Sequence, residues 1–122
     1  TIGAIASNVL TDTTDFTLDG RGFTELAEDE AVAEVLSAQQ LGDGPAPDVP
    51  VLVNHSVLDD VVPFSMGRDL AATWCRAGSD VAFEDNLGPT HIGGYLVALP
   101  RIEIFTARMF DGKEPLGSCW RL

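Results

Sequence analysis

Two short apolar segments, separated by a stretch of helical length, constrain the fold of this chain more than any other feature. Residues 50–55 begin with a proline and continue as a run of Val and Leu, and residues 81–83 place Val81 and Phe83 on one side of a second short segment. A continuous apolar run of this length is typical of a strand covered on both faces. Strand, helix and strand in this order predict two parallel strands of an α/β sheet.

The segment between these strands carries signals for the start and the end of a helix. Pro63 suits the first turn, apolar residues follow at helical spacing, and Gly78 is typical of the residue just past a helix end. After the second strand we predict a short helix near His91 and a last helix opened by Pro100.

The chain ends in a segment that we expect to be held against the core. Residues 113–122 carry no helical or strand pattern, but they include Cys119 and Trp120. Side chains of these types often anchor a terminus that would otherwise be poorly ordered. We therefore predict a tail fixed by these two residues.

The N-terminal part shows weaker patterns. Residues 1–22 mix Thr, Asp and Gly with scattered apolar residues and predict mostly irregular structure. Thr24 is a suitable N-cap for a helix over about 25–40. Residues 42–48 are rich in Gly, Pro and Asp, so they form the best candidate for an internal boundary.

Charge and hydropathy exclude several classes of protein. The formal net charge is −12, of which −11 falls on residues 1–60 and −1 on residues 61–122. An acidic surface of this kind repels nucleic acid and anionic membranes, so we predict no nucleic-acid partner. There is no run of 18 apolar residues, and we predict no transmembrane segment.

The two cysteines leave the compartment open at this point. In a secreted protein Cys75 and Cys119 would pair, and closing a loop of this size stabilises the fold by roughly 4 kcal/mol at most. In a cytosolic protein they would be free thiols. The chain opens at Thr1 without an initiator Met, which we interpret as a processed or trimmed start.

Asp59 and His91 are the candidate functional residues. Each follows one of the predicted strands, and the carboxyl ends of parallel strands meet at the sheet edge where α/β proteins place their active sites. An Asp and a His at that edge can form the acid–base half of a Ser-His-Asp triad. Asp60 is either a capping residue or a rival to Asp59.

Other readings of these residues remain open. His55 ends a strand, which favours a structural role, and a metal site from His55, Asp59, Asp60 and His91 lacks any recognised ligand spacing, so we predict no metal and no cofactor. The neighbouring Gly pair at 93–94 favours close backbone approach. An N-terminal threonine nucleophile at the chain start is a further alternative.

Four segments together resemble one known family. The sequence Pro-Val-Leu-Val-Asn-His-Ser-Val-Leu-Asp-Asp-Val-Val-Pro at 50–63 is similar to the acid loop of α/β-hydrolases, and most of all to secretory lipases of the fungal lipase A type and their actinobacterial relatives. Residues 70–78, Thr-His-Ile-Gly-Gly at 90–94 and residues 107–112 resemble the helix, the histidine loop and the closing helix that follow in that family. Ser56 departs from this resemblance, because Gly is the commoner residue at that position of the family's acid loop.

The resemblance implies a fold, a function and a location. The chain would be the C-terminal part of an α/β-hydrolase, with residues 1–45 belonging to a helical cap and residues 46–122 to the catalytic domain. It would be part of a secreted carboxylic ester hydrolase, a lipase acting on lipid or other esters, with Asp59 as the acid and His91 as the general base. No Gly-x-Ser-x-Gly turn occurs here, so the serine would come from an upstream remainder and the isolated chain would be inactive. The alternative is a non-catalytic remnant or an acidic binding module.

Overall fold

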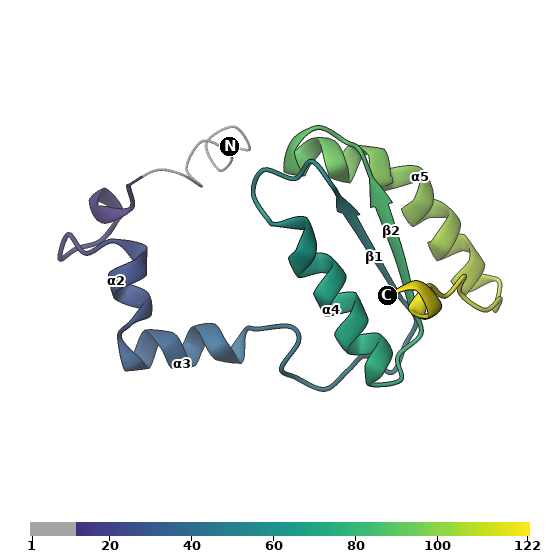
Figure 1. Cartoon of the computed structure of the whole chain (residues 1–122), viewed down its shortest axis with the longest axis horizontal. Coiled ribbons are helices and arrows are strands. Elements are labelled where there is room, and N and C mark those ends of the chain that lie inside the picture. Colours follow the sequence, from purple (N-terminus) through teal and green to yellow (C-terminus); the bar gives the residue numbers. More distant parts are fainter. Residues whose placement is uncertain (1–11) are drawn as a thin grey trace. The chain divides into compact units, whose positions relative to one another are not determined.

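The computed structural model describes residues 12–122, and the chain divides into two compact units (Figure 1). The first unit ends at Leu41 and the second is Gly42–Leu122. The breaker-rich residues 42–48 open the second unit and contain neither helix nor strand. No helix of the described part is long and apolar enough to cross a membrane.

The first unit holds short helices in place of the one long helix predicted from the sequence. A 3₁₀ turn, η1, covers Thr14–Phe16, and two helices follow, α2 over Phe23–Ala27 and α3 over Glu30–Ala38. The break comes at Asp29, whose carboxylate accepts the N–H of Ala31 and caps α3.

The predicted start of that helix is therefore wrong. Thr24 lies inside α2, and Gly22 is the residue that precedes the helix. The irregular structure expected for 1–22 is seen in the described residues 12–22 apart from η1, and the remainder of that prediction lies outside the described residues. No residue of 12–41 is buried, so this unit has no core of its own within the described chain.

The second unit is a strand–helix–strand–helix unit, which confirms the predicted α/β class with two parallel strands. Its elements are β1 (Val51–Ser56), α4 (Phe64–Arg76), β2 (Val81–Asn86), α5 (Thr90–Phe110) and the 3₁₀ turn η2 (Cys119–Arg121). β1 and β2 pair in parallel with Val51 opposite Val81 and Ser56 opposite Asn86. Both strands therefore end at the same edge of the sheet.

The alternation of side chains along β1 and β2 gives each helix its own face of the sheet. Val53 and Phe83 pack with Ala71 of α4 in the buried core. Their neighbours point to the other face, where Ser56 meets Gly94 of α5. The two helices thus cover opposite faces of the sheet, and α5 packs mainly against β1.

The end of α4 follows the sequence signal closely. Gly78 has φ +93°, a left-handed conformation that glycine adopts without steric cost. Its N–H donates to the Cys75 carbonyl, and the N–H of Ser79 donates to the Trp74 carbonyl, which is the paired bonding of a Schellman motif. The predicted role of Gly78 is confirmed.

The two helices predicted around His91 and Pro100 form one helix instead. α5 runs without interruption over 21 residues with Pro100 inside it, and the helix bends along its length in Figure 1. A proline in a helix removes one backbone donor and bends the axis, but packing on both sides of that point can keep the helix continuous. Ala98 and Ile102 flank the proline on the side that faces the sheet, and Ala98 is buried.

The C-terminal tail covers the outer edge of β2. Ser118 donates its N–H to the Val81 carbonyl, and its hydroxyl bonds both the N–H and the carbonyl of Phe83. Cys119 forms a disulfide with Cys75 of α4, with 5.5 Å between their Cα atoms. The pairing expected of a secreted protein is thus present.

Trp120 does not hold the tail, contrary to the prediction, because it is 85% exposed. Leu122 packs against the core in its place, and the guanidinium of Arg121 bonds the Phe83 carbonyl. The tail is therefore anchored by the disulfide, by hydrogen bonds to the backbone of β2 and by the packing of Leu122, and not by an aromatic side chain.

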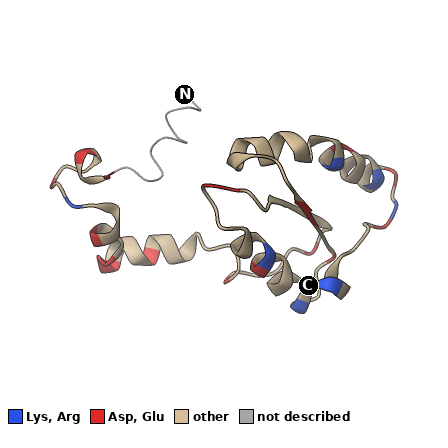
Figure 2. Cartoon of the chain, turned by 45° about the horizontal axis from the view of Figure 1, so that its top comes forward, with Lys and Arg blue, Asp and Glu red and all other residues tan. Residues whose placement is uncertain are grey.

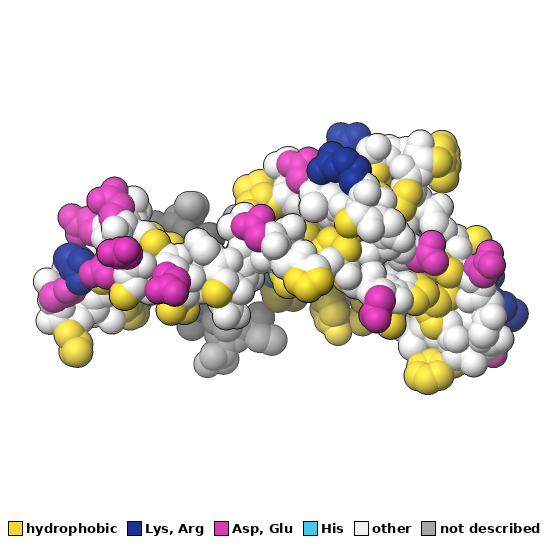
Figure 3. All heavy atoms as spheres, turned by 90° about the horizontal axis from the view of Figure 1, so that it is seen from below, with side chains coloured by type: hydrophobic (Ala, Val, Ile, Leu, Met, Phe, Trp, Pro, Cys, Tyr) yellow, Lys and Arg dark blue, Asp and Glu magenta, His cyan; other side chains and the backbone are white. Residues whose placement is uncertain are grey.

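Strand β1 has a helix on each face, as predicted, but its outer edge is open in the described chain. Its residues Val51 to His55 are only partly buried, and no backbone hydrogen bond reaches its outer edge within the described chain. Several residues of α5 are also open to solvent: Ile92, Leu96, Val97, Leu99 and Ile104. In the unit 42–122, Figure 3 likewise shows hydrophobic side chains on the surface beside acidic ones.

The charges follow the division of the chain. The charged residues of α2 and α3 are all acidic in Figure 2, and Arg21 is the single basic residue of the described part of that unit. The Lys and Arg residues of the chain otherwise belong to the second unit. One of them, Arg101, forms an ion pair with Glu84 on β2 at 3.3 Å.

Candidate active site

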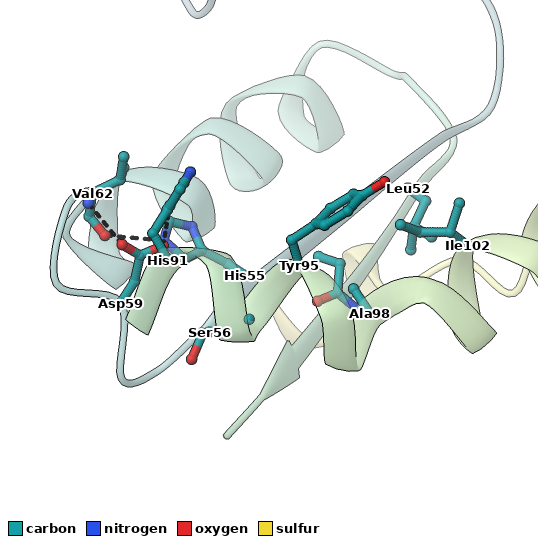
Figure 4. A pocket seen from close by; sticks show the side chains of 11 residues that line it. Leu52, His55, Ser56, Asp59, Val62, His91, Tyr95, Ala98 and Ile102 are labelled. Atoms are coloured by element: carbon teal, nitrogen blue, oxygen red, sulfur yellow. Dashed lines mark hydrogen bonds and ion pairs between the residues drawn. The ribbon is translucent and has the colours of Figure 1, made fainter. Parts of the chain in front are cut away.

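Asp59 and His91 meet at the shared edge of the two strands. The Nδ1 atom of His91 lies 2.7 Å from Oδ2 of Asp59, and Figure 4 shows the two side chains pointing toward each other. Asp59 comes from the loop after β1, and His91 is the second residue of α5. The distance is that of a short charge-assisted hydrogen bond, with the imidazole donating.

The surroundings of Asp59 favour its ionised form. Its side chain is only 4% exposed, and its Oδ1 accepts the N–H groups of Val61 and Val62, each at 2.9 Å. Burial works against ionisation, but these two donors and His91 outweigh it and hold the pKa of Asp59 below its ordinary value. The carboxylate is fixed by both of its oxygens.

His91 has the opposite exposure. Its side chain is 48% exposed, and the described residues provide no partner for its Nε2 atom. With Nδ1 bonded to a carboxylate, Nε2 is the nitrogen that can accept a proton. In this pair the Asp59 carboxylate is therefore buried, and the His91 ring is open to solvent.

Asp60 is a cap and not a rival for the histidine ring. Its Oδ1 accepts the backbone N–H of His91 at 2.9 Å. That N–H belongs to the first turn of α5, where a negative charge is favoured by the helix dipole. Two consecutive carboxylates thus hold one residue, Asp59 by the ring and Asp60 by the backbone.

Ser56, the last residue of β1, joins the loop that contains Asp59 to the loop that precedes His91. It is 2% exposed, and its hydroxyl donates to the Gly88 carbonyl at 2.6 Å and accepts the N–H of Leu58 at 3.0 Å. The first bond reaches the loop that carries His91, and the second lies in the loop that carries Asp59. Ser56, which departs from the Gly expected from the resemblance, therefore links the two loops.

Close backbone approach brings α5 to this edge. A Cβ placed on Gly94 would lie 2.7 Å from Cβ of Ser56, and one on Gly88 would lie 2.4 Å from the carbonyl oxygen of Gly93. Neither position has room for a side chain. The interpretation of the Gly pair at 93–94 as a close-approach feature is confirmed for Gly94, whereas a Cβ on Gly93 would come nearest to the Pro89 ring, at 3.1 Å.

Thr90 adds backbone strain next to His91. Its φ is +65°, in the left-handed region that β-branched residues rarely adopt. Strain of this kind persists only where the surroundings enforce it, and it is concentrated at functional sites. Here the strained residue is the first of α5, directly before His91, which bonds Asp59.

A cavity of about 320 Å³ opens beside the pair. It lies on the face of the sheet that α5 covers, and Figure 4 shows Tyr95, Ala98 and Ile102 of that helix along one side. Polar groups gather at one end, and Leu52 and the helix residues make the other end apolar. Its described lining residues are Leu52, Asn54, His55, Ser56, Asp59, Val62, His91, Gly94, Tyr95, Ala98 and Ile102.

The lining does not contain an available serine nucleophile among the described residues. Ser56 is its one serine, and that hydroxyl is used in the two bonds described above. Within residues 12–122, no three His, Cys, Asp or Glu side chains are grouped so as to hold a metal ion. Thr1, the alternative nucleophile, lies outside the described residues.

The site also contains contacts that the sequence did not indicate. His55 Nε2 lies 3.3 Å from Oδ2 of Asp59, in addition to the contact from His91. The links from Ser56 to Gly88 and from Asp60 to the His91 backbone were likewise not predicted. Each joins residues about 32 positions apart or depends on a side-chain direction, so local patterns carry no signal for it.

Comparison with known proteins identifies the family. The family model described as "Secretory lipase" matches residues 2–118. Secreted triacylglycerol lipase LIP2 of Malassezia furfur is 36% identical over 75 residues, which is 60% of this chain and 16% of that protein. Lipase 1 of Candida albicans is 30% identical over 111 residues, which is 85% of this chain and 24% of that protein.

The chain belongs to the secretory lipase family, as the resemblance in its sequence predicted. Secreted triacylglycerol lipase LIP5 of Malassezia globosa is another relative, 28% identical over 98 residues, 76% of this chain and 21% of its own length. The chain thus spans between 16% and 24% of the length of these three relatives. Family membership makes this an extracellular protein, and the disulfide agrees with an oxidising compartment.

Proposed function

We propose that this chain supplies the acid and the general base of a serine-dependent carboxylic ester hydrolase, a lipase. The observation that carries the proposal is the 2.7 Å bond between Asp59 and His91 Nδ1, with Nε2 left open beside the cavity. This is the arrangement of the acid–base half of a Ser-His-Asp triad. The names of the relatives support triacylglycerols or other lipid esters as substrates.

The roles of the two residues follow from their atoms. His91 Nε2 takes the proton of a serine hydroxyl as that oxygen attacks the ester carbonyl, and it returns the proton to the leaving alcohol. Asp59 accepts the Nδ1–H, keeps the required tautomer and stabilises the imidazolium that forms. Water then hydrolyses the acyl-serine by the same proton transfers.

An upstream segment completes the enzyme in this proposal. The sequence of 122 residues contains no Gly-x-Ser-x-Gly turn, so the serine and the oxyanion donors lie elsewhere in the longer protein. Two features support a larger α/β-hydrolase sheet: the outer edge of β1, which no backbone hydrogen bond reaches within residues 12–122, and the exposed apolar residues of α5. Residues 1–45 then belong to a cap over the cleft, and residues 46–122 to the catalytic domain.

The proposal is tested on the full-length protein that contains this chain. A fluorophosphonate probe should label one serine upstream of the chain, and Asp59→Asn or His91→Ala should lower kcat for a nitrophenyl ester by roughly 10⁴-fold. Asp85→Asn is the matched control, because Asp85 is an exposed carboxylate on β2. It should leave kcat unchanged.

Two results would contradict the proposal. Ester turnover by the isolated 122-residue polypeptide would show that the nucleophile lies within it. Full-length protein that neither reacts with the probe nor hydrolyses esters would favour the non-catalytic remnant instead.

A further inference from the structure

The side chain of His55 lies between the sheet and α4, beside Phe64 and Gly67 of that helix. Its side chain is 10% exposed, and its ring meets that of Phe64 edge-on with 5.7 Å between the centroids. A Cβ placed on Gly67 would lie 2.1 Å from Nδ1 of His55. Glycine at this point of α4 leaves the space that the imidazole fills.

The other ring nitrogen of His55 points at the acid loop. Its Nε2 lies 3.1 Å from the carbonyl oxygen of Val62 and 3.3 Å from Oδ2 of Asp59 (Figure 4). A carbonyl oxygen and an ionised carboxylate can only accept hydrogen bonds. The hydrogen of His55 is therefore on Nε2, where it is shared between these two oxygens.

Asp59 is thus contacted by two histidines through one oxygen. Oδ2 faces His91 Nδ1 at 2.7 Å and His55 Nε2 at 3.3 Å, while Oδ1 is held by two backbone N–H groups of the loop. The loop donors hold Oδ1, and the two histidines hold Oδ2. Of these contacts, the one from His55 ties the carboxylate to strand β1.

We propose that His55 is a positioning residue for the acid–base pair, an inference that rests on the proposed function. By holding Asp59 Oδ2 and the Val62 carbonyl together, it fixes the loop to the end of β1 with the carboxylate facing His91. It touches neither the reacting atoms nor the proton that is transferred. A misplacement of about 1 Å at a catalytic group lowers turnover by as much as roughly 100-fold, so the effect belongs in kcat.

The test compares two substitutions in the full-length enzyme. His55→Phe keeps an aromatic ring against α4 and removes the donor, whereas His55→Gln places an amide N–H near the position of Nε2. We expect kcat to fall by about 10- to 100-fold in His55→Phe with KM near its wild-type value, and to recover largely in His55→Gln. The low-field proton signal of His91 Nδ1–H should broaden in His55→Phe and sharpen again in His55→Gln.

Each contrary outcome has a defined meaning. Wild-type kcat in His55→Phe, or equal losses in the Phe and Gln variants with an unchanged His91 signal, would overturn the inference. If neither variant folds, nitrogen NMR of the wild-type enzyme decides, since a hydrogen on Nδ1 of His55 would equally overturn it. Asp59→Asn is measured in parallel, because its activity tests the proposed function. If Asp59→Asn is inactive and His55→Phe keeps wild-type kcat, the proposed function stands and only the inference about His55 is rejected.

Discussion

Replacing Ser56 by Ala tests how firmly the two loops of the site are joined. The substitution keeps the Cβ that packs against Gly94 and removes only the hydroxyl. That hydroxyl is buried and makes the 2.6 Å bond to the Gly88 carbonyl and the 3.0 Å bond from the Leu58 N–H. Ser56→Ala thus removes the buried link between the Asp59 loop and the loop that leads to His91, and leaves the bonds of Asp59 and Asp60 to His91 in place.

The cost can be worked from these two bonds. The loss of a bond whose partner stays hydrated costs about 1 kcal/mol, whereas a loss that leaves a buried partner unpaired costs about 1–3 kcal/mol in all. Because Gly88 is buried, we count one loss of each kind and expect a local destabilisation of about 2–4 kcal/mol. At about 1.4 kcal/mol per tenfold change, even the lower figure corresponds to a roughly 30-fold change in the opening equilibrium.

Amide hydrogen exchange in the full-length protein measures this quantity directly. Protection of the amides at the carboxyl ends of β1 and β2 should fall by about 30-fold or more in Ser56→Ala. Ser65→Ala provides the control, since Ser65 is exposed on α4 and should change stability by less than about 0.5 kcal/mol. Unchanged protection in Ser56→Ala, or an equal loss in the control, would refute the reasoning.

Three further changes have defined outcomes. Cys119→Ala removes the disulfide, whose loop closure is worth at most about 4 kcal/mol, and should release the tail from β2, seen as faster proteolysis after α5; unchanged proteolysis would contradict this. Gly94→Ala should destabilise by about 1–3 kcal/mol through its 2.7 Å clash with Ser56, whereas Gly44→Ala, with open space around it, should not, as thermal unfolding will show. In the folded protein the pKa of Asp59 lies below its ordinary value of 3.8, so the ionised carboxylate stabilises the fold fully above the unfolded-state pKa. This stabilisation is lost as the pH falls through the folded-state pKa. Asp59→Asn should therefore make the free energy of unfolding less dependent on pH in this acidic range.

The sequence predicted those features that depend on local patterns and on general topology. The apolar runs located β1 and β2, and Gly78 located the end of α4, because each signal is confined to a few neighbouring residues. The meeting of Asp59 with His91 followed from topology alone, since parallel neighbours end at one edge. Their catalytic roles remain a proposal.

The failures came from residues whose local and tertiary preferences differ. Asp29 satisfies an α3 donor and so divides what looked like one helix, while packing on the sheet keeps α5 continuous through Pro100. Trp120 looked like an anchor by composition, but the tail is held through backbone groups and a disulfide. The contact from His55 to Asp59 needed the position of the loop relative to the strand, which no spacing reveals.

Asp59, His91 and the residues that hold them all come from a single strand–helix–strand–helix unit. Asp59, His91, Ser56 and Asp60 lie within 36 consecutive residues, and their mutual bonds close inside that stretch. Motion of a cap or of another domain in a larger protein would then change how far a third group lies from the imidazole without parting the imidazole from its carboxylate. In the proposed enzyme, approach and withdrawal of that third group would then switch activity while the bond between Asp59 and His91 stays intact.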